Sequence, residues 1–294
     1  MNGKAVCWME GKIIRGDEAR VSVFDHGLLY GDGVFEGLRF YQRRVFRLSA
    51  HLERLFLSAR AIALDIRQSA GQIRDAVEKT VAAFPDENGY LRLIVTRGVG
   101  SLGIDPRKCP EPSLLIIGDE LAMVSPQARE RGASVIIAST RQTASDVLDP
   151  RIKSLNYLNR IMAKIEANMA GADEALVLNS LGHVMEGTAD NVFIVRNGRL
   201  LTPPVIEGAL DGITRAVALE LAHMAGIPAM ESPLAPYDIY TADECFLTGT
   251  GAEMIPVRQV DGRLMTSCPG PVFTELSARF SALVMENGEN EDLR

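Results

Sequence analysis

Residues 34–41 read Val34-Phe35-Glu36-Gly37-Leu38-Arg39-Phe40-Tyr41, a run rich in aromatic and branched side chains that is typical of a β-strand. A paired strand is predicted at 45–48. Ser49 is then expected to cap a helix over about 50–63, because the apolar residues of that segment repeat at helical spacing. A strand pair followed directly by an amphipathic helix indicates a fold that mixes both kinds of element.

The same mixture continues on both sides of this region. Further strands are expected as a hairpin over 6–14 and near 90–97, 113–117, 134–138, 174–178, 191–195 and 244–248, and further helices near 69–83, 155–170, 213–225 and 272–286. The class is therefore α/β or α+β. A chain of 294 residues is long enough for two domains. We expect a small N-terminal domain over 1–117, an interdomain loop over 118–126 and a larger C-terminal domain over 127–294.

Composition excludes several classes of function. The formal net charge is −7 and no cluster of Lys and Arg stands out, which argues against a nucleic-acid partner. The four cysteines are far apart in the sequence, so neither a metal site nor a disulfide framework is expected. No apolar run is long enough to cross a bilayer, and a reducing cytoplasm is the expected location.

One nucleotide-binding motif is rejected. Residues 98–103 match the dinucleotide fingerprint G-x-G-x-x-G after a predicted strand. The fingerprint requires a helix to begin at once so that its N-terminus meets the pyrophosphate. Here Pro106 and Pro110 follow, so we interpret this segment as a loop.

Lys153 is the most unusual lysine of the chain. It lies where a loop or strand end runs into a predicted helix, between the apolar residues Ile152 and Leu155. Apolar neighbours disfavour the charged amine and lower its pKa, as a lysine that forms a Schiff base requires. An ordinary surface lysine fits the segment equally well, although a cation at a helix start opposes the helix dipole.

A carboxylate and two backbone turns could complete a cofactor site. Glu186 stands between apolar residues and Gly187, where it could face a protonated ring nitrogen or simply lie on an exposed hairpin. The segment 211–215 opens a helix after a glycine, and 247–253 is a Thr/Gly turn after a strand. Both offer N–H groups to a phosphate, and both could equally be plain caps or turns.

Two arginines could bind anions. Arg47 ends a predicted strand and could pair with a phosphate. Arg92 follows Tyr90 by two residues, so both side chains fall on one face of a strand and could bind a carboxylate together. A surface ion pair is the alternative for either arginine.

Taken together, these segments resemble the class IV aminotransferases along almost the whole chain, and specifically the branched-chain amino acid aminotransferases. The motifs that carry the resemblance, in order, are Tyr30–Gly37, Tyr90–Arg92, Lys153–Leu158, Glu186–Phe193, Gly212–Arg215 and Thr248–Val257. The resemblance implies a fold type IV enzyme with pyridoxal 5'-phosphate held between a small N-terminal α/β domain and a larger C-terminal pseudo-barrel α/β domain.

The resemblance also implies residue roles at the cofactor. Lys153 is the implied Schiff-base lysine and proton shuttle, Glu186 the partner of the pyridine nitrogen, and Tyr157 the donor to the ring hydroxyl. The implied phosphate ligands are Arg47, Ile213 through its backbone, Thr214 and Thr250.

Substrate contacts are implied in the same way. The α-carboxylate site would consist of Tyr90, Arg92 and the backbone of Thr250 and Gly251, and the side-chain pocket of Tyr30, Phe35 and Gly37. The implied reaction exchanges the amino group between L-leucine, L-isoleucine or L-valine and 2-oxoglutarate. The implied assembly is at least a homodimer, in which a loop near Val99–Leu102 reaches the neighbouring active site, and the loop around 118–125 covers the substrate.

Two other enzymes of the same fold are alternative interpretations. One is a D-amino acid aminotransferase, in which the carboxylate and side-chain pockets exchange roles, and the other is an aminodeoxychorismate lyase. The pair Tyr90-x-Arg92 favours the branched-chain reading. The connector has no aromatic residue, unlike some family members, which leaves room for activity on D-amino acids or (R)-amines. A catalytically silent binding protein is the alternative of another class, and the retained Lys153 and Glu186 argue against it.

Overall fold

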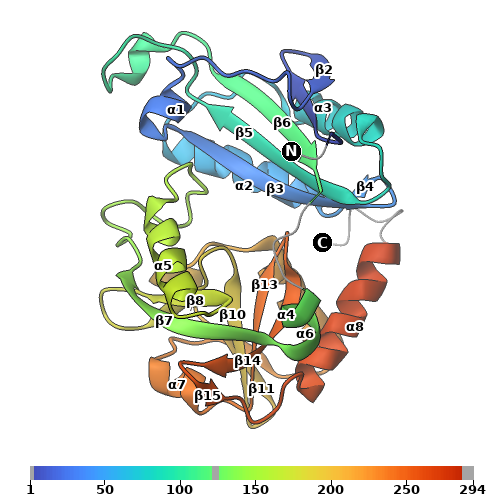
Figure 1. The fold of residues 1–294 in the computed structure, drawn as a ribbon, viewed down its shortest axis with the longest axis vertical. Helices are drawn as coiled ribbons and strands as arrows, with labels where there is room; N and C mark the ends of the chain where they lie inside the picture. The colour runs from blue at the N-terminus through green and yellow to red at the C-terminus, as the bar shows by residue number, and fades with distance from the viewer. Residues whose placement is uncertain (1–2, 121–125, 287–294) are drawn as a thin grey trace. The chain divides into compact units, whose positions relative to one another are not determined.

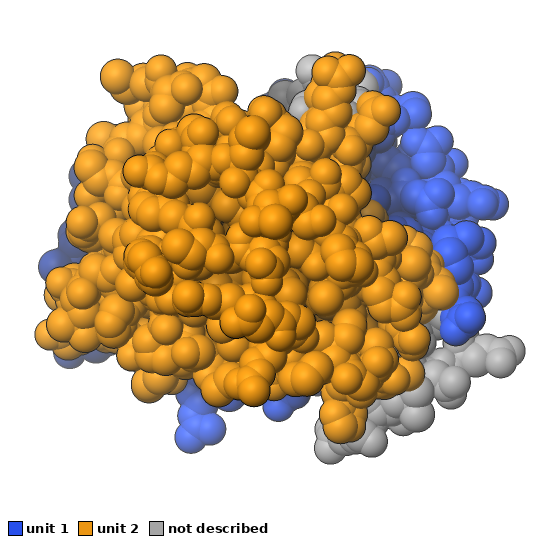
Figure 2. Space-filling model, turned by 90° about the horizontal axis from the view of Figure 1, so that it is seen from below, with its two compact units in different colours: residues 1–121, 152–156, 284–294 blue, residues 122–151, 157–283 orange. Residues whose placement is uncertain are grey.

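The computed structural model describes residues 3–120 and 126–286, which divide into two compact units. Among the described residues, unit 1 comprises 3–120, 152–156 and 284–286, and unit 2 comprises 126–151 and 157–283 (Figure 2). Part of the predicted interdomain loop, residues 121–125, lies outside the described residues, so its role over the substrate stays a prediction. The short segment around Lys153 belongs to unit 1, although the predicted boundaries assign it to the C-terminal domain.

Unit 1 is built on a six-stranded sheet in the order β2-β1-β6-β5-β3-β4 (Figure 1). Its elements are β1 (Val6–Met9), β2 (Lys12–Arg15), α1 (His26–Tyr30), β3 (Gly33–Tyr41), β4 (Arg44–Val45), α2 (Leu48–Ala61), α3 (Ala70–Ala83), β5 (Gly89–Thr96), the 3-10 helix η1 (Pro106–Lys108) and β6 (Ser113–Asp119). Helices α2 and α3 cover one face of this sheet.

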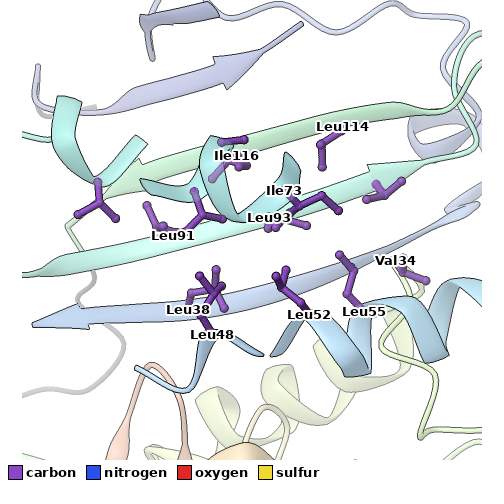
Figure 3. Close-up of a cluster of buried hydrophobic side chains, with 14 of the residues drawn as sticks. Val34, Leu38, Leu48, Leu52, Leu55, Ile73, Leu91, Leu93, Leu114 and Ile116 are labelled. Atoms are coloured by element: carbon purple, nitrogen blue, oxygen red, sulfur yellow. The ribbon is translucent and has the colours of Figure 1, made fainter. Parts of the chain in front are cut away.

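The core of unit 1 lies between that sheet face and the two helices. Apolar side chains of β3, β5 and β6 meet those of α2 and α3, and Figure 3 labels Val34, Leu38, Leu48, Leu52, Leu55, Ile73, Leu91, Leu93, Leu114 and Ile116. Successive side chains of a strand point to opposite faces. Because Val34 and Leu38 face the core, Phe35 and Gly37 point to the other face of the sheet, which carries the candidate site.

Helix α2 begins earlier than the sequence predicted. Its N-cap is Arg47, whose φ of 53° is left-handed, and the predicted cap Ser49 lies inside the first turn and accepts a hydrogen bond from Arg74. Strand β4 ends at Val45, so the predicted strand over 45–48 is wrong beyond that point. The capping box of α3 is confirmed, because Ser69 and Gln72 exchange side-chain to backbone hydrogen bonds.

The segment 152–156, which contains Lys153, lies alongside β3 and pairs with it through backbone hydrogen bonds. The Phe35 N–H donates to the carbonyl of Lys153 at 2.9 Å, and the Leu155 N–H donates to the carbonyl of Gly33 at 3.0 Å. Ile152 packs against the core of unit 1. The segment 152–156 is therefore fixed by backbone pairing to a central strand.

The rejected nucleotide motif is a loop in the structure. After β5 ends at Thr96, the chain runs through 98–103 to η1, which has only three residues. His26 contacts the carbonyl of Ser101 at 3.0 Å, and the Gly103 N–H donates to the hydroxyl of Tyr30 at 2.9 Å. The loop is thus tied to α1 and opens no helix that could receive a pyrophosphate.

Unit 2 is built on a nine-stranded mixed sheet in the order β12-β11-β10-β13-β14-β7-β8-β9, with β15 paired to β14. Its elements are α4 (Pro126–Arg131), β7 (Ala133–Arg141), α5 (Leu158–Met169), β8 (Glu174–Leu178), β9 (Val184–Glu186), β10 (Asn191–Arg196), β11 (Arg199–Thr202), η2 (Val205–Glu207), α6 (Ile213–Met224), β12 (Ala229–Glu231), α7 (Pro236–Tyr240), β13 (Glu244–Gly249), β14 (Glu253–Val260), β15 (Arg263–Leu264) and most of α8 (Pro271–Glu286). Strand β9, at one end of the order, also lies near β10, so the sheet curls into a half-barrel. Among the described residues, no helix is long and apolar enough to cross a membrane.

Candidate active site

The face of the unit 1 sheet that points away from α2 and α3 carries an amine and a guanidinium on one aromatic ring. The Nζ of Lys153 lies 4.7 Å from the centre of the Phe35 ring, and the guanidinium carbon of Arg92 lies 4.5 Å from the same centre. Cations are attracted to the face of an aromatic ring at such distances. The two groups are therefore separated by no more than the sum of these two distances.

Tyr90 shares this face, as the spacing Tyr90-x-Arg92 predicted. The guanidinium carbon of Arg92 lies 5.5 Å from the centre of the Tyr90 ring. Gly37 pairs with Arg92 across β3 and β5, and a Cβ atom on Gly37 would lie 2.2 Å from the Tyr90 hydroxyl oxygen. The absence of a side chain at Gly37 thus makes the room that the Tyr90 phenol occupies.

On the opposite face of β3, a buried ion pair anchors α2 to the strand. Glu36 is fully buried, and both of its carboxylate oxygens accept hydrogen bonds from Arg54 at 2.7 Å. His51, also buried, donates through Nδ1 at 2.8 Å, because a carboxylate can only accept. Burial alone would raise the pKa of Glu36, but Arg54 and then His51 outweigh it and hold that pKa at about 2.

The same helix supports the lysine segment. The Lys153 N–H donates to the hydroxyl of Ser58, a buried residue of α2, at 3.2 Å. Burial lowers the pKa of His51, which keeps the imidazole neutral, and the nearby charge of Lys153 acts in the same direction. Strand β3, helix α2 and Lys153 are therefore linked through Glu36, Arg54 and Ser58.

In unit 2, Glu186 at the end of β9 is buried and held by three donors. Its Oε1 accepts from Arg160 at 2.5 Å and from the side-chain amide of Gln142 at 3.0 Å, and its Oε2 accepts from the Leu210 N–H at 3.0 Å. A carboxylate offers about four acceptor positions. Oε2, with one donor among the described residues, can still accept from a ring N–H.

Arg160 is the residue that the sequence analysis missed. It lies in the first turn of α5, three residues after Tyr157, and its guanidinium carbon is 5.2 Å from the centre of the Tyr157 ring. Burial opposes its charge, but the carboxylate of Glu186 outweighs this, so the pKa of Arg160 is raised. The available signal was the spacing of three residues, which places Tyr157 and Arg160 on one helix face.

The N-terminus of α6 is tied to Glu186. Leu210, whose N–H binds the glutamate, accepts a hydrogen bond from the side-chain amide of Asn191 at 2.9 Å. A Cβ atom on Gly212, the N-cap of α6, would lie 2.0 Å from the Asn191 side-chain oxygen. The backbone N–H groups of Ile213 and Thr214, in the first turn of α6, are thereby held at a fixed position relative to the Glu186 carboxylate. The start of a helix is suited to binding an anion.

The turn at Thr250 and Gly251 approaches the same region through the sheet. Thr248 of β13 pairs with Asn191 of β10, and the turn follows directly after β13. Gly251 is buried and Thr250 is half-buried. The carboxylate of Glu186, the N-terminus of α6 and the Thr/Gly turn are thus gathered at one end of the unit 2 sheet.

The predicted site residues are divided between the two units. Lys153, Phe35, Gly37, Tyr90 and Arg92 gather in unit 1, and Tyr157, Glu186, Ile213, Thr214, Thr250 and Gly251 belong to unit 2. Arg47 caps α2 in unit 1, and Tyr30, in α1, contacts His26 and the loop at Gly103. The roles predicted for Arg47 and Tyr30 stay predictions.

Comparison with known proteins identifies the family of this chain. The family described as "Amino-transferase class IV" matches residues 33–260. A Methanocaldococcus jannaschii protein with the provisional name branched-chain-amino-acid aminotransferase is 48% identical over 274 residues, covering 93% of this chain and 94% of its own length. The branched-chain amino acid aminotransferase of Escherichia coli has a crystal structure with a TM-score of 0.93 at 32% identity, covering 97% of this chain and 96% of that one. The branched-chain aminotransferase from Thermoproteus uzoniensis, solved with norvaline, has a TM-score of 0.90 at 34% identity, covering 97% and 96%. The family match spans more than half of the chain and these relatives cover nearly all of it, so the chain belongs to the class IV aminotransferases.

Proposed function

We propose that this chain is a branched-chain amino acid aminotransferase of fold type IV that exchanges the amino group between L-leucine, L-isoleucine or L-valine and 2-oxoglutarate. The observation that carries the proposal is the placement of the Lys153 amine and the Arg92 guanidinium on one ring, that of Phe35. An amino acid carries its amine and its carboxylate on one carbon. A site that acts on it therefore needs a group that reacts at the amine and a cation that binds the carboxylate, close to each other. The names of the relatives support the branched-chain substrates.

The cofactor is pyridoxal 5'-phosphate, and the residues present fit it. Glu186 is a buried carboxylate with an acceptor position left, which suits a pyridine N–H. The N-terminus of α6 suits a phosphate. Relatives of known structure were solved with pyridoxamine 5'-phosphate and with N-(5'-phosphopyridoxyl)-L-glutamate. When bound, the cofactor supplies an electron sink at the substrate α-carbon.

The chain's own residues would then have distinct roles in the reaction. Lys153 would hold the cofactor and carry the α-proton, and Glu186 would keep the ring nitrogen protonated. Tyr157 would donate to the ring hydroxyl, and Ile213, Thr214, Thr250 and Arg47 would bind the phosphate. Arg92, with Tyr90 and the backbone at Thr250 and Gly251, would bind the α-carboxylate, and Tyr30, Phe35 and Gly37 would line the side-chain pocket.

The proposal includes a cytoplasmic homodimer. Unit 1 has several exposed apolar side chains in two stretches that are far apart in the sequence, namely Val21, Val23, Phe24 and Leu28, and Val99, Leu102 and Ile104. The two stretches are joined by a bridge between Asp25 and Val99. Exposed apolar patches of this kind mark interaction surfaces. A second copy covering this patch would bring the loop at Val99–Leu102 into the interface.

A panel of single half-reactions tests the proposal. The purified yellow protein would be mixed separately with L-leucine, D-alanine, (R)-1-phenylethylamine and aminodeoxychorismate, and the visible spectrum followed. We expect L-leucine to bleach the visible band fastest, with 2-oxoglutarate restoring it. Faster bleaching by D-alanine or the amine would instead indicate the D-amino acid or (R)-amine reading, and pyruvate release from aminodeoxychorismate would indicate the lyase. A protein that no donor bleaches would be a silent binding protein.

A further inference from the structure

The first turn of α5 carries a buried cation that the proposed reaction does not use. Arg160 is only 9% exposed, and its guanidinium donates to the Oε1 of Glu186 at 2.5 Å and to the carbonyl of Thr188 at 3.3 Å. On its other side lies the ring of Tyr157, 5.2 Å from the guanidinium carbon. Arg160 therefore touches both side chains expected to hold the cofactor ring in unit 2.

Placing an arginine at position 160 costs free energy in two ways. A positive charge in the first turn of a helix opposes the helix dipole. Burial of the guanidinium adds to this cost unless the charge is paired and hydrogen-bonded. The carboxylate of Glu186 is the compensating group, so the arginine and the glutamate form one unit.

Hydrogen bonding alone does not require this arginine. Gln142 and the Leu210 N–H already bind Glu186, one at each oxygen, and both are neutral. What Arg160 adds is a full charge and a rigid planar group that fixes the direction of the carboxylate. The guanidinium pairs with one oxygen of the Glu186 carboxylate and leaves the other facing the N–H of Leu210, so the direction in which that second oxygen can accept a further donor is fixed.

We propose that Arg160 is a positioning residue that fixes the orientation of the Glu186 carboxylate while it packs against the ring of Tyr157, so that the two contacts expected for the cofactor ring keep a fixed spatial relation. This inference rests on the proposed function. It assigns no chemistry to Arg160 itself, which acts through Glu186 and Tyr157.

The test uses four full-length proteins: the wild type, Arg160→Met, Glu186→Gln and the double variant. Cofactor dissociation constants are measured by titrating pyridoxal 5'-phosphate into the cofactor-free proteins, and the visible band of each loaded protein is followed against pH. Truncating one partner of a buried charge pair leaves the other unpaired, so Arg160→Met should weaken cofactor binding by about tenfold or more and change the pH dependence of the band. In the Glu186→Gln background the same substitution should have little further effect, because coupled residues are not additive.

Two further variants separate this role from simple stabilisation. Arg160→Lys keeps the charge but not the planar group, and should recover only part of the cofactor affinity. Arg196→Met removes an arginine from another ion pair of unit 2, with Asp238, and should leave cofactor affinity and spectrum unchanged. If Arg160→Met fails to fold, the comparison is made between Arg160→Lys, Glu186→Gln and the double variant, which has neither charge.

The outcomes distinguish the inference from the proposed function. An Arg160→Met protein that melts earlier without cofactor, yet binds it with wild-type affinity and spectrum, would overturn the inference and leave the proposed function intact. Additive effects of Arg160→Met and Glu186→Gln would also overturn it. A wild-type protein that binds no cofactor would refute the proposed function, and the inference with it.

Discussion

Substitution of Glu36 by Gln should destabilise unit 1 strongly at neutral pH and hardly at all in acid. The carboxyl is buried between Arg54 and His51, and its pKa falls from an ordinary 4.5 to about 2 in the folded protein. A shift of this size corresponds to about 3 kcal/mol of stability at pH 7. Gln resembles the protonated carboxyl, so the variant should lose about that amount.

The sign of the pH dependence follows from the depressed pKa. The stabilisation is present above the unfolded pKa of 4.5 and is lost as the pH falls toward about 2. The difference between wild type and Glu36→Gln should therefore be nearly constant from pH 7 to 5 and reduced to about half at pH 3.

The assay can be confined to unit 1. Trp8 is the single tryptophan of the chain and packs against the unit 1 core, so its fluorescence during urea unfolding reports that unit. Glu53→Gln, on the exposed side of the same helix, is the matched control and should change the free energy of unfolding by less than about 0.5 kcal/mol. A difference between wild type and Glu36→Gln that is the same at pH 7 and pH 3, or that does not exceed the control, would refute this reasoning.

Three further substitutions address the site. Arg92→Ala should raise KM for L-leucine by about a hundredfold, because a charge-assisted contact to the carboxylate is lost, while the cofactor dissociation constant stays near wild type; equal losses in both would contradict the assigned role. Gly37→Ala places a Cβ atom 2.2 Å from the Tyr90 hydroxyl oxygen and should displace that ring. We expect kcat/KM for L-leucine to fall by about tenfold, whereas the control Leu57→Ala, at an exposed position of α2, should leave it unchanged. Gly212→Ala pushes against Asn191 at the start of α6 and should weaken cofactor binding by about tenfold in a titration; unchanged binding would remove that helix start from the phosphate site.

The parts of the fold that the sequence predicted depend on local periodicity. Tyr90 and Arg92 share a face because side chains of a strand alternate, and this needs no tertiary information. The capping box at Ser69 was visible for the same reason, since its two partners are three residues apart.

The parts that were missed depend on contacts between distant segments. Arg160 and Glu186 are 26 residues apart, and neither position signals the other in the sequence. The lysine segment pairs with β3, which no local pattern around Lys153 indicates. Strand β14 was not predicted; its Pro256 lacks an N–H, which is unusual within a sheet, yet the residue pairs with Phe246 of β13. Arg47 caps α2 in a left-handed conformation that its own side chain does not favour.

Chemical mapping of the cofactor linkage tests the central assignment most directly. The yellow protein would be reduced with borohydride, digested and analysed by mass spectrometry to find which of its six lysines carries the phosphopyridoxyl group. We expect the label on the peptide that contains Lys153 and on no other peptide. A label on any other lysine, or a yellow protein that borohydride does not label, would contradict that assignment.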